Sequence, residues 1–211
     1  MRRMKRELPI IVLILSLVSV PVTLAHISLR NYIQHHIAIT ASAENIDIVV
    51  DLSFYENCAA RERIKMDADH DGRISDSEVR AYLDKIAEKV QDGLRLSIDG
   101  RPVDLLVLHE PKLDLMGFAQ TGPHPHLLHL FYFARTPEAL KTGATIALTD
   151  SLWPDVDAIR GVEIQGKDGF RFSAIPTRDS GVWQGKCVAS ATRVSASEAR
   201  ETSRQHVSER R

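Results

Sequence analysis

The chain has 211 residues, a formal net charge of −1 at pH 7 and 26% charged residues. This balance leaves no basic stretch of the kind that binds nucleic acid, so we expect no nucleic-acid partner. Hydrophobic residues make up 44% of the chain, which is enough for the core of one domain.

Residues 1–25 have the composition of an export signal. Basic residues come first, an apolar run follows from Pro9 to Val22, and Thr23-Leu24-Ala25 offers small residues where a signal peptidase cuts. We therefore predict a periplasmic or secreted protein, cleaved near Ala25. The alternative is an uncleaved anchor in the inner membrane, since an apolar run of about 17 residues is at the lower limit for a span.

Two strands and two helices are predicted next. Apolar and polar residues alternate from Ile33 to Thr40 and from Ile46 to Phe54, which predicts a hairpin turning at residues 42–45. A helix from about Glu56 to Met66 is weakly indicated, because charged residues crowd it. A second helix begins after Glu78 and ends near residue 93. Its expected apolar face consists of Val79, Tyr82, Leu83, Ile86 and Val90.

The remaining pattern is mostly strand. Residues 94–98 alternate up to the turn Asp99-Gly100, and residues 103–107 lead back. Residues 127–134 are apolar almost throughout, which predicts a central strand covered on both faces. Residues 144–148 alternate again. We expect residues 162–164 to pair with residues 170–172 across a turn at 166–169.

These elements predict a mostly β protein with a small α insertion. Eight or nine short strands favour an Ig-like β-sandwich built from residues 26–54 and 93–176, with a helix-loop-helix inserted at 55–92. Residues 177–211 are predicted to be a disordered tail. In an oxidising compartment Cys58 and Cys187 could form a disulfide, but we expect two separate thiols, because Cys187 falls in the predicted disordered tail.

One acidic stretch indicates a chemistry. Oxygen-bearing residues alternate from residue 67, a glycine follows the third of them, and a glutamate closes the stretch. Calcium takes six to eight oxygen ligands, and alternate residues of a tight loop can aim them at one point. The candidate metal ligands are Asp67, Asp69, Asp71, the backbone carbonyl of Arg73, Ser75 and Glu78.

This stretch resembles the calcium loop of the EF-hand family, with Gly72 at the sixth position, Ile74 at the eighth and Glu78 at the twelfth. The resemblance implies bound Ca²⁺ as cofactor. EF-hands usually occur in pairs, and the sequence holds no second such loop, so this hand must pack against another part of the chain or a second molecule. In layout the chain is also similar to bacterial extracytoplasmic domains that precede the helix bundles of nickel/cobalt-export-type membrane proteins, which agrees with a periplasmic setting.

Histidines form a second candidate metal site. His124 and His126 share one face of an extended segment, and His26 would become the first residue after signal cleavage. Copper, nickel or zinc handling is therefore the alternative to calcium binding. His129 points to the other face, and His35 falls on the apolar side of its strand and is expected to be structural.

The sequence shows no catalytic motif: a nucleophile elbow, a His-Glu-x-x-His pair, a phosphate loop and a dinucleotide fingerprint are all missing. We therefore predict a non-enzymatic, exported calcium-binding protein. Besides the calcium ion, we expect a protein partner, and a membrane protein is one candidate. The sequence does not identify this partner.

Overall fold

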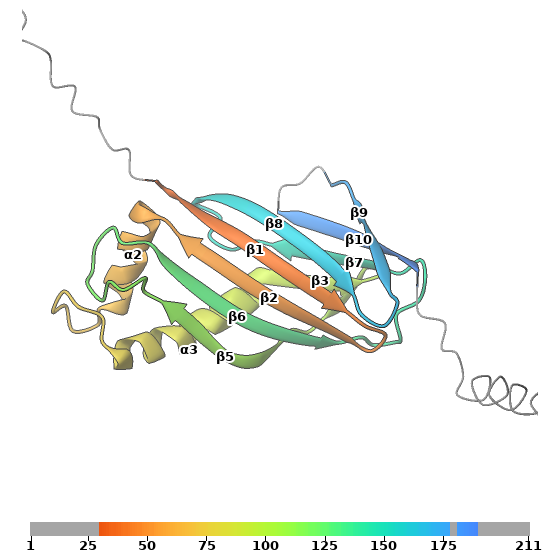
Figure 1. The fold of residues 1–211 in the computed structure, drawn as a ribbon, viewed down its shortest axis with the longest axis horizontal. Coiled ribbons are helices and arrows are strands. Elements are labelled where there is room, and N and C mark those ends of the chain that lie inside the picture. Colours follow the sequence, from red (N-terminus) through yellow and green to blue (C-terminus); the bar gives the residue numbers. More distant parts are fainter. Residues whose placement is uncertain (1–29, 178–180, 190–211) are drawn as a thin grey trace, which may run out of the picture.

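The computed structural model describes residues 30–177 and 181–189. This part of the chain is mostly β, with two five-stranded sheets and two helices (Figure 1). In chain order the elements are β1 (Tyr32–Ala41), β2 (Asn45–Phe54), α2 (Glu56–Met66), α3 (Asp76–Gly93), β3 (Leu94–Ile98), β4 (Arg101–Val103), β5 (Leu106–Asp114), β6 (His126–Arg135), β7 (Thr145–Asp150), β8 (Asp157–Gly166), β9 (Arg171–Ile175) and β10 (Val182–Ala189).

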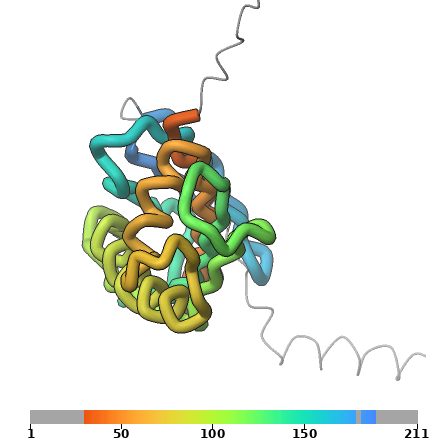
Figure 2. The backbone as a smooth tube through the Cα atoms, turned by 90° about the vertical axis from the view of Figure 1, so that its left-hand side faces the viewer, coloured from red at the N-terminus to blue at the C-terminus, as the bar shows by residue number. Residues whose placement is uncertain are grey.

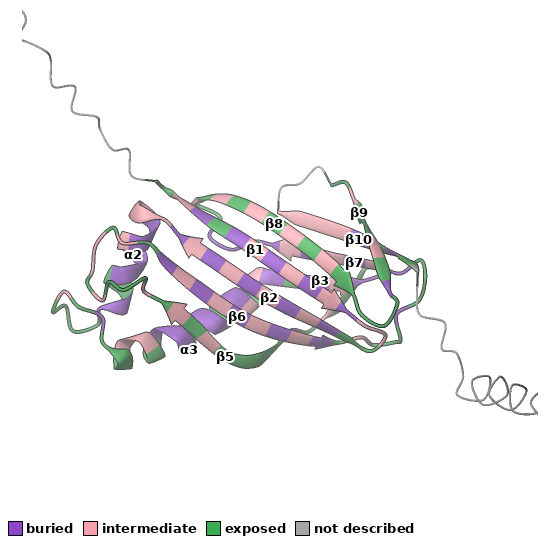
Figure 3. Cartoon of the chain, viewed as in Figure 1, coloured by how far each residue is buried: buried purple, intermediate pink, exposed green. Residues whose placement is uncertain are grey.

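The first sheet has the order β5-β6-β2-β1-β8. The predicted hairpin of β1 and β2 is confirmed, and the Ser42 amide donates to the Asn45 carbonyl at 2.8 Å in its turn. Buried and half-buried residues alternate along β1, β2 and β6 (Figure 3), because one face of the sheet covers the core. The prediction that residues 127–134 are covered on both faces is therefore wrong: alternate residues of β6 remain half-buried.

The second sheet has the order β4-β3-β7-β10-β9. The turn at Asp99-Gly100 joins β3 to β4 as predicted, but the predicted return strand at residues 103–107 is wrong, because β4 ends at Val103 and residues 106–107 belong to β5 of the first sheet. The prediction of a disordered tail from residue 177 is wrong over residues 182–189, which form β10. This segment lies between β7 and β9 and pairs with both, so its backbone groups are satisfied on two sides. Residues 190–211 lie outside the described part.

A further correction concerns β8 and β9, which do not form the predicted hairpin. β8 pairs in parallel with β1, whereas β9 pairs with β10 in the other sheet. The connection between them is fixed at Lys167, whose amide donates to the carbonyl of Ala41 at 2.8 Å. The edge of β1 that does not face β2 is long, and β8 pairs with β1 along it. The short turn at residues 167–170 then leads from the first sheet to the second.

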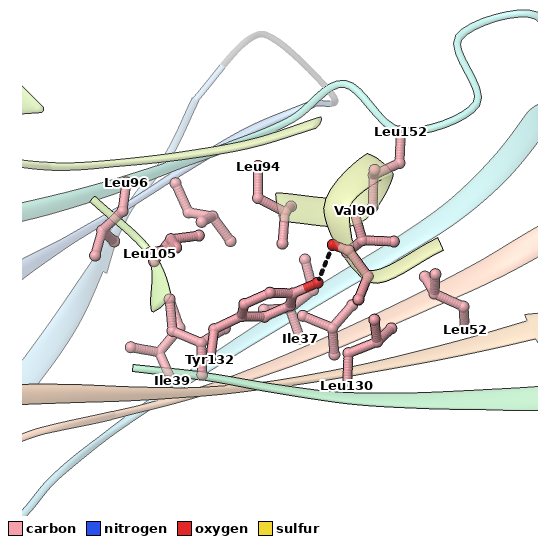
Figure 4. Close-up of a cluster of buried hydrophobic side chains, with 14 of the residues drawn as sticks. Ile37, Ile39, Leu52, Val90, Leu94, Leu96, Leu105, Leu130, Tyr132 and Leu152 are labelled. Atoms are coloured by element: carbon pink, nitrogen blue, oxygen red, sulfur yellow. Dashed lines mark hydrogen bonds between the residues drawn. The ribbon is translucent and has the colours of Figure 1, made fainter. Parts of the chain in front are cut away.

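The core lies between the inner face of the first sheet and a layer formed by α3 and the second sheet (Figure 4). Tyr132 of β6 reaches across it and donates its hydroxyl to the carbonyl of Ala87 in α3 at 2.9 Å. The predicted apolar face of α3 is confirmed, since Tyr82, Leu83, Ile86 and Val90 are buried and Val79 is partly buried against the same core. At about 1.5–3 kcal/mol for each large apolar side chain, this face holds the helix on the sheets.

Helices α2 and α3 lie between β2 and β3 in the chain. α3 runs from one end of the molecule along the sheets to β3, and α2 lies at that same end (Figures 1 and 2). The first described residues are also there: the Arg30 amide donates to Glu56 Oε2 at 3.2 Å. Cys58 in α2 and Cys187 in β10 are both buried, and these two described cysteines form no disulfide. Among the described residues, neither helix has the length and apolarity to cross a bilayer. The predicted signal at residues 1–25 lies outside the described part.

Candidate metal centre

The acidic loop is the connection between α2 and α3, and it gathers three carboxylates. One oxygen from each of Asp67, Asp69 and Asp71 lies within 4.8 Å of the others, in the only such group of His, Cys, Asp or Glu found over residues 30–177 and 181–189. Asp67 is buried at the end of α2, whereas Asp69 and Asp71 are exposed. The alternation of the sequence therefore brings the first three predicted ligands together. Carboxylates converging in this way suit a hard cation.

Backbone amides inside the loop hold these carboxylates in place. The two Asp67 oxygens accept from the amides of Asp71 at 3.1 Å and Gly72 at 3.0 Å, and Asp71 Oδ1 accepts from the amide of Arg73 at 2.7 Å. The chain reverses at His70, with φ of 63°, and at Gly72, with φ of 83°. Because Gly72 has no Cβ, the chain adopts this positive φ there without strain.

Glu78 closes the loop from the first turn of α3. Its Oε1 accepts from the amide of Ala68 at 2.6 Å, and its Oε2 accepts from the amide and hydroxyl of Ser75, each at 2.8 Å. Ser75 caps α3 in a reciprocal capping box with Glu78. These hydrogen bonds, first of all that from the Ser75 amide, lower the pKa of Glu78 to about 2. The predicted last ligand is therefore ionised and already tied to both ends of the loop.

Residues 72–74 of the acidic loop pair with residues 119–121, which belong to the connection between β5 and β6. We call this connection, residues 115–125, the supporting loop. The Ile74 amide donates to the Ala119 carbonyl at 2.6 Å, and the Thr121 amide donates to the Gly72 carbonyl at 3.1 Å. Arg73 and Gln120 form an antiparallel bridge between them. Ile74, which lies between two candidate ligands, is buried. The supporting loop thus satisfies backbone groups of the acidic loop that would otherwise lack a protein partner.

Arg63 of α2 organises the supporting loop. Its side chain is fully buried, with 0% exposure. Its guanidinium donates five hydrogen bonds, all to backbone carbonyls of this one segment. The acceptors are Leu115, Phe118, Gln120, His124 and Pro125. A planar group with five donors is the only side chain that can collect so many carbonyls.

Glu62, the preceding residue, ties α2 to the rest of the fold. Its buried carboxylate accepts from Tyr82 Oη at 3.2 Å, Trp153 Nε1 at 3.3 Å and Lys65 Nζ at 2.7 Å. Burial alone would raise the pKa of Glu62, but the hydrogen bonds from Lys65 and Trp153 and the charge of Lys89 lower it below its usual value. The carboxylate therefore links α2 to α3 and to the segment between β7 and β8.

Sequence reasoning missed Glu62 and Arg63, which it treated only as polar residues that weaken a helix. A usable signal was present. The buried residues of α2 are Cys58, Ala59, Glu62, Arg63 and Met66, which follow a helical spacing. A pattern search that admits charged residues at buried positions would have found this face of α2. It would not have found the supporting loop that the face contacts.

The structure separates the two histidines of the alternative metal site. His126 is fully buried and stacks on Phe54 with ring centroids 4.6 Å apart. Neither of its ring nitrogens has a hydrogen-bond partner in the described part, and the nearby His124 carbonyl accepts from Arg63 instead. His124 stacks on Phe118 in the supporting loop. His26 lies outside the described residues.

Two other histidines make hydrogen bonds. His35 is buried, and its Nδ1 lies 2.6 Å from Asp150 Oδ2, in agreement with the expected structural role. His129 is half-buried, and its Nδ1 lies 2.7 Å from Asp51 Oδ1 on the outer face of the first sheet.

Comparison of the chain with protein-family models and with curated proteins gave no match. The function must therefore be inferred from the residues and their geometry, and the acidic loop with its supporting loop is the most complete site among the described residues.

Proposed function

We propose that this chain is an exported, non-enzymatic calcium-binding protein, in which one EF-hand is inserted into an Ig-like β-sandwich. Asp67, Asp69, Asp71, Ser75 and Glu78 would hold the ion together with the carbonyl of Arg73. The observation that carries the proposal is the convergence of three carboxylate oxygens within 4.8 Å of one another. The hydrogen bonds of Glu78 to both ends of the same loop add support.

The chemistry of the site favours calcium over a transition metal. All the proposed ligand atoms are oxygens, four of the residues are carboxylates, and the loop is short and partly exposed. Hard oxygen ligands in such number suit Ca²⁺, whereas zinc, copper and nickel prefer imidazole or thiolate. Export would place the protein where calcium is abundant and a weak site is sufficient.

The supporting loop gives a physical reason why a lone hand can function. In this proposal residues 115–125 take the place of the second EF-hand, since they pair with the acidic loop on both sides of Arg73. Arg63 fixes their carbonyls from α2. Calcium would then order three parts together: the acidic loop, the two helices and the supporting loop.

The size of the effect follows from mass action. A dissociation constant of ~0.1 mM at ~1 mM calcium gives about 1.4 kcal/mol. That free energy can order a local segment but is small beside the stability of a whole domain. We therefore assign calcium a local structural role, in which the ordered surface is available to a protein partner.

The experiment is calorimetric titration of the purified full chain with calcium. We expect one ion per chain and a dissociation constant raised about tenfold or more in Glu78→Gln, which removes a bidentate charged ligand. Glu88→Gln is the matched control, since Glu88 is an exposed glutamate on the same helix. Absence of binding at millimolar calcium, or equal weakening in both variants, would refute the proposal.

A further inference from the structure

A cavity of about 240 Å³ is lined by strands of both sheets, and none of its lining residues belongs to the acidic loop or the supporting loop. Strands β1 and β8 of the first sheet and β7 and β10 of the second supply most of its wall. A larger hollow of about 500 Å³ is lined by Ile98, Asp99, Arg101 and residues 137–144, and it has no buried polar side chain in its wall. The smaller cavity does have such side chains, together with apolar ones, which is the composition of a ligand site.

One part of the wall is polar and centres on Asp150 of β7. Asp150 Oδ2 lies 2.6 Å from His35 Nδ1 of β1 and 3.3 Å from Arg160 Nε of β8. Asp150 Oδ1 accepts from the Leu152 amide at 3.0 Å. Burial alone would raise the pKa of Asp150, but its interactions with His35, the Leu152 amide and the charge of Arg160 lower it below its usual value. The ionised carboxylate therefore holds the guanidinium of Arg160 from behind.

Arg160 is the charged group that a ligand can reach. The side chain of His35 is 0% exposed and that of Asp150 is 4% exposed, whereas that of Arg160 is 20% exposed. It is also the only arginine or lysine in the cavity wall. Within the described part of the chain, Arg160 donates from Nε to Asp150 and from Nη2 to the Leu152 carbonyl at 3.4 Å, and Nη1 makes no hydrogen bond. A guanidinium carries five N–H donors, so Arg160 keeps donors for a further acceptor.

The rest of the wall is mostly apolar. Each of the four strands contributes a large apolar side chain: Ile37, Leu148, Val162 and Trp183. The indole of Trp183 lies close against the backbone of β10, because a Cβ added at Gly185 would be only 2.3 Å from its Cη2. Glycine at this position thus allows the ring to lie flat on the strand.

We propose that this cavity binds a small carboxylate with an apolar body. Arg160 binds the two carboxylate oxygens, because the planar fork of a guanidinium matches them in geometry and charge. Asp150, the only carboxylate in the wall, turns its oxygens toward His35, Leu152 and Arg160, so it positions the guanidinium. The apolar body of the ligand lies against Trp183.

The size of the cavity limits the ligand. Its volume is below the range of about 300–1,000 Å³ that is usual for drug-sized molecules, so a short aromatic or aliphatic acid fits and a long-chain acid does not. The cavity shares no residue with the proposed calcium ligands, so the two sites are independent.

The test is calorimetric titration of the full chain with sodium benzoate, and with benzamide as the matched neutral ligand. We expect one benzoate per chain at millimolar concentration or below, and no measurable binding of benzamide, which has nearly the same shape but no charge. Arg160→Gln should raise the benzoate dissociation constant about tenfold or more, because it removes the charge-assisted hydrogen bonds. Arg171→Gln is the control variant, since Arg171 is an exposed arginine of β9 outside the cavity wall. Thermal unfolding checks that both variants are folded.

Nuclear magnetic resonance provides a second readout that needs no variant, because the chain has two tryptophans. Benzoate should shift the indole N–H signal of Trp183 more than that of Trp153, which does not line the cavity. The proposal is overturned if benzoate leaves the Trp183 signal in place, if benzamide binds equally well, or if both arginine variants bind benzoate alike. Glu78→Gln should bind benzoate normally and Arg160→Gln should bind calcium normally, so a failure of this proposal is distinguishable from a failure of the calcium proposal.

Discussion

Arg63 carries a full positive charge in a position with no exposed surface, and it is paired with carbonyl dipoles in place of a carboxylate. Such an arrangement is stable only if every donor finds an acceptor, because an unsatisfied buried group costs about 1–3 kcal/mol. The supporting loop has no regular structure of its own, so these hydrogen bonds are what define its path.

We expect Arg63→Met, which keeps the length of the side chain but removes its donors, to lower the free energy of unfolding by about 3 kcal/mol or more. Chemical denaturation measures this change. Arg61→Met is the matched control, because Arg61 is an exposed arginine on the same helix whose main partner is the Asn31 side chain at 2.9 Å. Equal stability of the two variants would contradict the role assigned to Arg63.

His126 makes the fold sensitive to acid. Burial, together with the positive charge of Arg63, lowers the pKa of His126 to about 4, from an ordinary value near 6.5. A lowered histidine pKa favours the neutral ring in the folded state. The neutral ring therefore contributes about 3 kcal/mol to the free energy of unfolding. This contribution is fully present above about pH 6.5 and is lost as the pH falls from there through 4.

We therefore expect His126→Phe to remove about this much of the acid destabilisation between pH 6.5 and pH 4. At pH 7 the variant should differ from the unchanged chain by no more than about 1 kcal/mol, because phenylalanine can keep the stack on Phe54 and neither ring nitrogen has a partner to lose. Urea unfolding at a series of pH values measures both effects. Parallel pH profiles for the two proteins would show that His126 does not titrate as described.

At the scale of elements, the pairing of the acidic loop with the supporting loop should influence calcium affinity. Thr121→Pro removes the amide that donates to the Gly72 carbonyl at 3.1 Å. One such hydrogen bond contributes about 0.5–1.5 kcal/mol, so the calcium dissociation constant should rise about two- to tenfold.

Thr121→Ala is the companion variant, because it keeps that amide and removes only the weaker hydroxyl contact to Gly72 at 3.4 Å. It should bind calcium nearly as the unchanged chain does. If calorimetry gives the same affinity for the proline and alanine variants, the supporting loop does not stabilise the site through this pair.

The sequence predicted the elements whose pattern is local. The β1–β2 hairpin, both helices and the turn at Asp99-Gly100 were found, because alternation, helical spacing and turn residues act within a few positions. The same is true of Asp67, Asp69 and Asp71. What escaped prediction depends on distant partners: β10 is a strand because β7 and β9 flank it, and β8 joins β1 across more than a hundred residues. Arg63 belongs to this second group.

For the whole molecule, α2 and the acidic loop lie at one end, and the sheets continue beyond them (Figure 1). The links of residues 55–92 to the rest of the fold include the apolar face of α3, the Glu62 carboxylate and the supporting loop. A change confined to the acidic loop can therefore reach the supporting loop directly, while the far ends of the sheets keep their own core contacts. Calcium should act on one region of the protein and leave the remainder unchanged.

Hydrogen exchange with and without calcium tests this central claim most directly. An effect of about 1.4 kcal/mol predicts that calcium slows exchange about tenfold at amides in residues 55–92 and at Thr121 of the supporting loop. Amides of β1 should be unaffected, and Glu78→Gln should abolish the change. Exchange that is equally fast with and without calcium in residues 55–92 and at Thr121 would contradict the account.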